Sequence, residues 1–211
     1  MIDSLTGKLL VASSLVTDPM YAGGVCLVVH HDEENLIGVM LNRPLKPTPE
    51  AMKTMLGDSG TEGEPDESTG TNRLPAEDSL EPPDFVGGSP WRLLHFGGPL
   101  SGPVVAVHPI SQYGDVETGH GIFVAAQKDH LEHLVREQEG PCRLIVGHLG
   151  WETEQLQSEI DEGIWHIVPA TVETVFSPAQ EMWSQIIRRA TSCSLARWIG
   201  TNDNPHAASV N

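Results

Sequence analysis

The chain has 211 residues, of which 39% are hydrophobic and 19% charged, so it can bury one core of ordinary size and needs no second domain. Twelve basic and 29 acidic side chains give a formal net charge of −17, which argues against direct DNA binding because phosphate contact needs clustered Lys and Arg. No apolar run approaches the roughly 20 residues that cross a bilayer, and no secretory signal is evident, so we expect a cytoplasmic protein with no membrane segment.

Short apolar runs in the first part of the chain predict three strands, over 8–13, 25–30 and 37–41. A turn is predicted at Asp18-Pro19. The last two strands are joined by a short polar segment, residues 31–35, which favours an antiparallel hairpin.

Residues 57–90 are rich in Gly, Ser, Thr, Pro, Glu and Asp and lack an aliphatic pattern. Such a composition buries too little apolar surface to offset the entropy of ordering, so it predicts a flexible acidic loop. An acidic arm that docks on a basic partner stays open as the alternative. We expect a single domain over 1–200 with this loop inside it, followed by a flexible tail over 201–211.

Beyond the loop, strands and single helices alternate irregularly. Strands are predicted over 93–96, 104–108, 122–126, 142–147 and 164–168, and helices over 129–139, over 153–162 and from Pro178 onward. Hairpins mixed with single helices favour an α+β fold with a mostly antiparallel sheet.

Several short motifs, most of them containing glycine, follow one another in a fixed order. They are Gly7–Ala12, Asp18-Pro19, Gly38–Leu45, Phe96–Pro99, His108 at the end of a strand, Gly147–Glu159 and Trp165. In this order, over roughly residues 7–57 and 92–190, the chain resembles the YqgE/AlgH family of bacterial proteins. The resemblance implies an α+β fold whose sheet is curved into a partial barrel flanked by a few helices. It also implies a bacterial cytosolic protein, in a family labelled as transcriptional regulators without an established biochemical activity.

Two positions depart from the family pattern. Relatives usually carry an aromatic residue followed by Arg-Ser where this chain has Tyr21–Gly24, and a glycine where it has Glu154. A ligand contact that relatives make at these positions would be changed here.

The first candidate site combines two strand ends. Asn42 and Arg43 either terminate a strand or present a five-donor guanidinium to a carboxylate or phosphate. Gly97 and Gly98 allow close approach of the backbone to a ligand or to a neighbouring strand. If these two segments are adjacent in space, they form a pocket for an anion.

The second candidate site surrounds a short helix. Gly150 and Trp151 precede the helix, whose amino-terminal amides favour negative charge, while Gln155 and Glu159 share one of its faces. Packing of Trp151 in the core and a solvated helix face are the structural alternatives. His108 ends a strand, but no Ser, Cys or Asp stands at the spacing of a catalytic triad.

Neither histidine cluster supplies the three or four convergent ligands of a zinc site. The clusters are His30-His31-Asp32 and His130 with His133. We therefore predict no catalytic residue, no metal site and no cofactor.

The leading hypothesis is a non-enzymatic cytoplasmic protein that binds a protein partner or a small anionic ligand and regulates transcription indirectly. The alternative is an enzyme acting on a small phosphorylated or carboxylated substrate in a pocket around Arg43, Gly97-Gly98 and His108. A third interpretation is an assembly role through an exposed Trp151 or Trp165. The sequence leaves the oligomeric state open.

Overall fold

The computed structural model describes residues 4–45, 94–137 and 139–199, with side chains up to 191. Its strands form two five-stranded sheets. From edge to edge, the first sheet consists of β10 (Trp165–Pro169), β1 (Lys8–Ala12), β2 (Val25–His31), β3 (Asn35–Met40) and β9 (Leu149–Glu152). The second consists of β4 (Leu94–Phe96), β8 (Arg143–Val146), β5 (Val105–His108), β7 (Ile122–Ala125) and β6 (Val116–Gly119).

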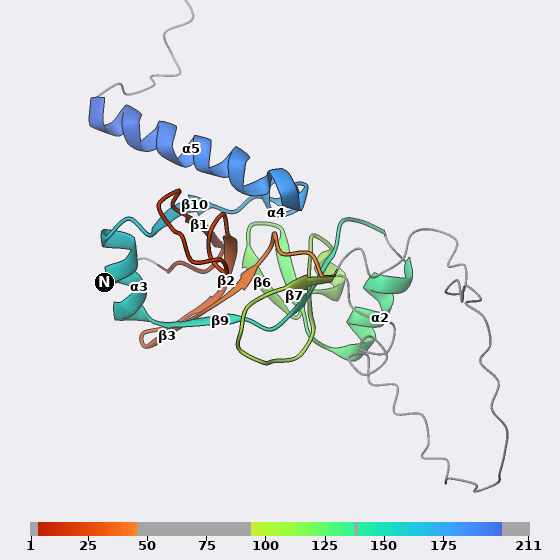
Figure 1. The fold of residues 1–211 in the computed structure, drawn as a ribbon. Coiled ribbons are helices and arrows are strands. Elements are labelled where there is room, and N and C mark those ends of the chain that lie inside the picture. Colours follow the sequence, from red (N-terminus) through yellow and green to blue (C-terminus); the bar gives the residue numbers. More distant parts are fainter. Residues whose placement is uncertain (1–3, 46–93, 138, 200–211) are drawn as a thin grey trace, which may run out of the picture.

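All neighbouring strands are antiparallel except β4 and β8, which run parallel. The sheets do not close into a barrel. The predicted α+β class and its mostly antiparallel, partly barrel-like arrangement are thus confirmed (Figure 1).

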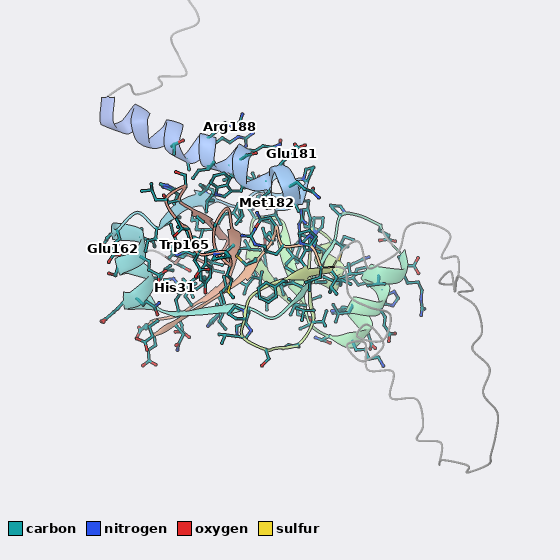
Figure 2. The ribbon with its side chains drawn as sticks, viewed as in Figure 1. His31, Glu162, Trp165, Glu181, Met182 and Arg188 are labelled. Carbon is teal, nitrogen blue, oxygen red and sulfur yellow. The ribbon has the colours of Figure 1, made fainter. Side chains whose placement is uncertain are left out.

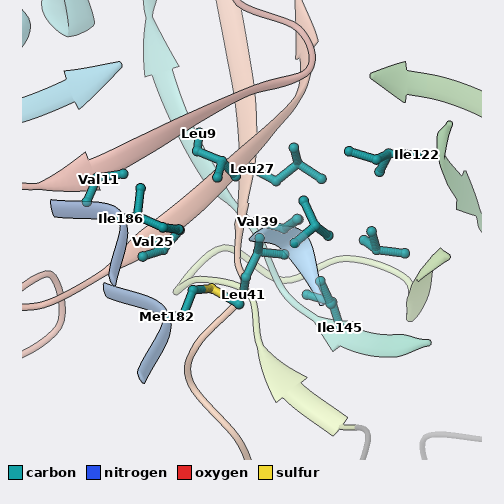
Figure 3. Packing of buried hydrophobic residues seen from close by; sticks show 12 residues of the cluster. Leu9, Val11, Val25, Leu27, Val39, Leu41, Ile122, Ile145, Met182 and Ile186 are labelled. Atoms are coloured by element: carbon teal, nitrogen blue, oxygen red, sulfur yellow. The ribbon is translucent and has the colours of Figure 1, made fainter. Parts of the chain in front are cut away.

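The central strands of the first sheet are buried on both faces. Side chains alternate along a strand, so Leu9 and Val11 of β1 join one core cluster while Leu10 and Ala12 join another. The first cluster packs against the second sheet and α5 (Ala179–Ile199), through residues such as Ile145 (Figure 3). This two-sided burial explains why these strands are continuous apolar runs in the sequence.

Four α-helices surround the sheets within the described residues. They are α2 (Lys128–Glu137), α3 (Thr153–Asp161), α4 (Val172–Val175) and α5, and a 3₁₀ turn, η2, spans Ser111–Tyr113. Helix α5 lies along β1 and β10, while α2 and α3 lie at opposite ends of the molecule (Figure 1). The indole N–H of Trp183 ties α5 to the sheet by donating to the Ala12 carbonyl at 2.8 Å.

Two isolated bridges join segments that lie between the sheets. Pro44 pairs with His95, and Leu100 pairs with His148, both antiparallel. They bring the strand end around Arg43 and the Phe96–Leu100 motif together with the Gly147–Trp151 motif.

The sequence interpretation missed β6, β9 and α4. Strand β9 was interpreted as the approach to a helix, but its residues pair with β3, with Leu36 opposite Trp151. The predicted acidic loop at 57–90 and the tail at 201–211 lie outside the described residues. Within the described residues, no helix combines the length and apolar character of a membrane span.

Candidate functional site

A pocket of about 630 Å³ lies beside α3, where three segments distant in the sequence converge. They are the turn after β1 (residues 13–21), the pair Pro99-Leu100, and the segment from β9 through α3 to Trp165. Leu100 joins the second segment to the third. Its N–H donates to the His148 carbonyl at 3.1 Å, and its carbonyl accepts from the His148 N–H at 3.0 Å. Figure 2 shows Glu162 and Trp165 at this α3 end of the molecule.

The carboxylate of Glu159 accepts three hydrogen bonds from other residues of the pocket. Its Oε2 accepts from the indole N–H of Trp165 at 2.8 Å and from that of Trp151 at 3.2 Å. Its Oε1 accepts from the side-chain amide of Gln155 at 2.8 Å. Strands β9 and β10 supply the indoles and α3 supplies the other two groups, so the carboxylate orientation depends on three elements of the fold.

Three aromatic rings stand edge to face along the pocket. The Tyr21 and Trp165 ring centroids are 6.1 Å apart at an interplanar angle of 83°, and those of Trp151 and Trp165 are 6.0 Å apart at 89°. The indoles of Trp151 and Trp165 are 8% and 3% exposed, so they form the floor, while the partly exposed Tyr21 forms a wall. Burial, together with the carboxylates of Asp18 and Glu159, raises the pKa of the Tyr21 hydroxyl.

Every charged residue that lines the pocket is acidic. The carboxylates belong to Asp18, Glu159 and Glu162, and no Lys, Arg or His is present among the lining residues. None of the ion pairs found within the described part of the chain includes these three carboxylates. The pocket therefore carries net negative charge.

Four residues of the second predicted site line this pocket: Gly150, Trp151, Gln155 and Glu159. The predicted pairing of Gln155 with Glu159 is present. Sequence reasoning did not assign Tyr21, Asp18 or Glu162 to this site, and it considered Trp165 only in the family pattern and in an assembly role. One sequence feature could have indicated the site: Glu159 lies between Trp151 and Trp165, on a short helix that separates the strands of the two tryptophans.

Asn42 and Arg43 lie outside the pocket lining and instead hold the turn that precedes β2. The Asn42 side chain accepts from the Val25 N–H at 3.0 Å and donates to the Gly23 carbonyl at 2.8 Å. The Arg43 guanidinium donates to the carbonyls of Ala22 at 2.7 Å and Met20 at 3.2 Å. Partial burial lowers the pKa of Arg43. These bonds fix the turn that carries Tyr21, so both residues act on the pocket through its wall.

Gly97 and Gly98 are buried and do not line the pocket either. The expected adjacency to residues 42–43 is present, since the Phe96 N–H donates to the Arg43 carbonyl at 2.8 Å. A Cβ on Gly97 would collide with the Gly147 carbonyl, and one on Gly98 with the His148 carbonyl. The glycines thus allow two chain segments to approach closely.

His108 is fully buried at the end of β5 and does not line the pocket. Its Nδ1 accepts from the Ile110 N–H at 3.3 Å, and its ring stacks on Phe123 at 6.3 Å. Its Nε2 has no hydrogen-bond partner among the described residues. Burial, with a contribution from His130, lowers the pKa of His108, so the ring is neutral near pH 7.

The fold and the order of its motifs agree with comparisons to known proteins. The chain belongs to the AlgH-like family, whose model matches residues 9–193. The UPF0301 protein CT0663 of Chlorobaculum tepidum is 31% identical over 191 residues, covering 86% of this chain and 84% of its own length. A UPF0301 protein of Streptomyces coelicolor is 31% identical over 197 residues, with coverages of 89% and 88%.

Two solved structures share the fold. The crystal structure of protein DIP2367 from Corynebacterium diphtheriae has a TM-score of 0.62 and 22% identity, covering 89% of this chain and 88% of its own. The solution structure of the AlgH protein from Pseudomonas aeruginosa has a TM-score of 0.58 and 21% identity, with coverages of 100% and 99%. The expected membership of the YqgE/AlgH family is confirmed.

Proposed function

We propose that this AlgH-like protein is a non-enzymatic cytoplasmic protein that acts by binding, and that the pocket beside α3 holds its ligand or a group of its partner. The main support is the convergence of three sequence-distant segments on one cavity of about 630 Å³, a volume typical of small-molecule sites. Leu15 and Leu100, which are 84% and 47% exposed, add apolar surface to the pocket lining. Exposed apolar side chains gathered around a cavity are typical of binding sites.

A regulatory role would be indirect. The net charge of −17 and the acidic pocket lining both oppose contact with nucleic-acid phosphates. An effect on transcription would therefore follow from binding a partner or ligand rather than an operator.

The enzymatic alternative needs Arg43, Gly97-Gly98 and His108 around one cavity. The contacts of Arg43 are backbone carbonyls, those of the glycines are neighbouring backbone, and His108 is enclosed in the core. This geometry gives the alternative no support. The acidic lining likewise does not favour the anionic ligand that the sequence suggests.

The assembly interpretation requires a tryptophan on the surface. Both Trp151 and Trp165 are buried except where they line the pocket, so their burial does not support an exposed tryptophan interface.

The test compares two arginine substitutions at exposed apolar positions. Leu100→Arg fills the pocket entrance, whereas Val116→Arg changes β6, whose Val116 is 56% exposed and outside the lining. In thermal melts against a panel of small anions, cations and neutral compounds, we expect some compound to stabilise wild type and Val116→Arg but not Leu100→Arg. If no compound distinguishes the two variants, the pocket is not the binding site.

A further inference from the structure

The negative charge in the pocket is not neutralised by the residues around it. The bonds to the Glu159 carboxylate come from two indoles and one amide, all uncharged. Neutral donors orient a carboxylate without cancelling its charge, and Oε1, which accepts only the bond from Gln155, keeps acceptor capacity for a further partner. Asp18 and Glu162 add two more carboxylates to the lining. A cavity with low-dielectric walls concentrates such a field on whatever enters it.

The aromatic rings favour the same sign of charge. The face of an indole or phenol ring carries negative potential and attracts cations, most strongly where water is excluded. Trp165 stands nearly perpendicular to both Tyr21 and Trp151, and both indoles direct their N–H edges at Glu159, so their faces lie beside the carboxylate. The carboxylate and the rings thus act together on one occupant.

The lining also distinguishes an organic cation from a metal ion. Within the described residues, no three His, Cys, Asp or Glu side chains lie close enough to hold a metal. The indole floor and the apolar residues Leu15 and Leu100 instead suit a cation with a hydrocarbon surface. An ammonium group bearing methyl or methylene groups has both the charge and the apolar surface that this pocket complements.

We propose that the pocket binds a small organic ammonium ion, whose charge lies against the Glu159 carboxylate and whose carbon groups contact Tyr21, Trp151 and Trp165. This proposal depends on the proposed function and specifies the chemical class of the ligand. It replaces the anionic ligand that the sequence alone suggests with a cationic one.

The primary test is calorimetric titration of the full chain with choline and with its uncharged carbon isostere, in which a tert-butyl group replaces trimethylammonium. The two probes match in shape and differ in charge. We expect choline to bind and the isostere to bind at least about tenfold more weakly. Equal affinity for both probes would overturn the proposal, because it would show that shape alone governs binding.

Substitutions locate the binding site. Glu159→Gln should weaken choline binding at least about tenfold, whereas Glu154→Gln, on an exposed position of the same helix outside the lining, should change it less than about twofold. Because Glu159 also holds two indoles, Glu162→Gln serves as a second variant with less structural risk, and we expect a smaller but measurable loss. Unchanged affinity in both pocket variants would contradict the proposed position of the charge.

Two further outcomes separate this inference from the proposed function. If choline fails to bind while an anion or neutral compound stabilises the wild type and not Leu100→Arg, the ammonium proposal is wrong and the binding function stands. If no compound binds the pocket, both are wrong. A peptide carrying trimethyllysine that binds more tightly than choline would show that the occupant is a protein side chain and would overturn the small-molecule assignment.

Discussion

The Glu159 carboxylate is oriented by the indoles of Trp151 and Trp165 and the amide of Gln155, without a charged partner among them. Deleting one donor would leave the other two in place, so the remaining bonds would still orient the Glu159 carboxylate. At the scale of single residues, the proposed binding site depends on this arrangement. Arg43 and His108, which the sequence also suggests as site residues, make contacts within the fold and do not line the pocket.

Arg43→Ala should destabilise the fold without removing the ligand site. The substitution leaves the carbonyls of Met20 and Ala22 without their donor, at a cost of about 1 to 2 kcal/mol in the free energy of unfolding. Urea unfolding measures this loss. Because the turn carries Tyr21, calorimetry should find choline binding weakened but still present. A variant of normal stability that no longer binds would show that Arg43 contacts the ligand directly.

His108 should make the protein less stable in mild acid. Its folded pKa is lowered by burial, whereas an unfolded histidine titrates near about 6.5. Below that pH the unfolded chain takes up a proton that the folded state binds less readily, so the contribution is present at higher pH and is lost as the pH falls.

The comparison is between wild type and His108→Asn, which removes the titrating group but keeps an acceptor near the Ile110 N–H. The variant should be less stable at pH 7.5 by about 1 to 3 kcal/mol. Between pH 7.5 and 5.5 it should lose less of its free energy of unfolding than the wild type does. Parallel losses in urea unfolding at the two pH values would show that His108 does not titrate as its burial requires.

At the scale of elements, strands and helices are joined by side-chain bonds that cross between them. Arg143 on β8 is buried and donates to the carbonyls of Val175 at 2.8 Å and Ser177 at 2.5 Å, on the segment from α4 to α5. It also donates to Nε2 of His95 on β4 at 2.8 Å. Burial lowers the pKa of Arg143 to about 10, which leaves it charged at neutral pH. One side chain thus connects the second sheet to the helical layer.

Arg143→Met should cost about 2 to 4 kcal/mol in the free energy of unfolding, because the buried Val175 carbonyl and the partly buried Ser177 carbonyl lose their donor. Arg136→Met, at an exposed position of α2, is the matched control and should change stability by less than about 0.5 kcal/mol. Denaturant titration of both variants checks this. Similar small effects would mean that β8 and the α4–α5 segment are held together by apolar packing alone.

Whether a strand could be predicted from the sequence depends on whether its stabilising contacts are local or distant in the chain. Strands β1, β2 and β3 are buried on both faces and follow one another in the sequence. Their apolar runs and the short polar connection between β2 and β3 were therefore sufficient to predict them. Strand β9 was missed because Leu149–Glu152 stands directly before an acidic helix start, and its strand state depends on distant pairing with β3. Strand β6 is largely exposed and lacks an apolar pattern.

At the scale of the whole molecule, the two sheets determine which predicted residues meet. Gly150, Trp151, Gln155 and Glu159 are close in sequence and were predicted together. Tyr21, Asp18 and Trp165 reach the same pocket only through the pairing of β1, β2 and β10, which no local pattern encodes. The sequence analysis therefore did not predict a cationic ligand, because that prediction depends on carboxylates and rings from two segments that are distant in the sequence.

The most direct measurement is an NMR titration of the full chain with choline that follows the indole N–H signals. We predict that the signals of Trp151 and Trp165 shift with one common dissociation constant, because both indoles donate to Glu159. The indole of Trp183, bonded to the Ala12 carbonyl, serves as the internal control and should not move. Unchanged Trp151 and Trp165 signals, or a shift of the Trp183 signal alone, would contradict the assignment of the pocket beside α3 as the functional site.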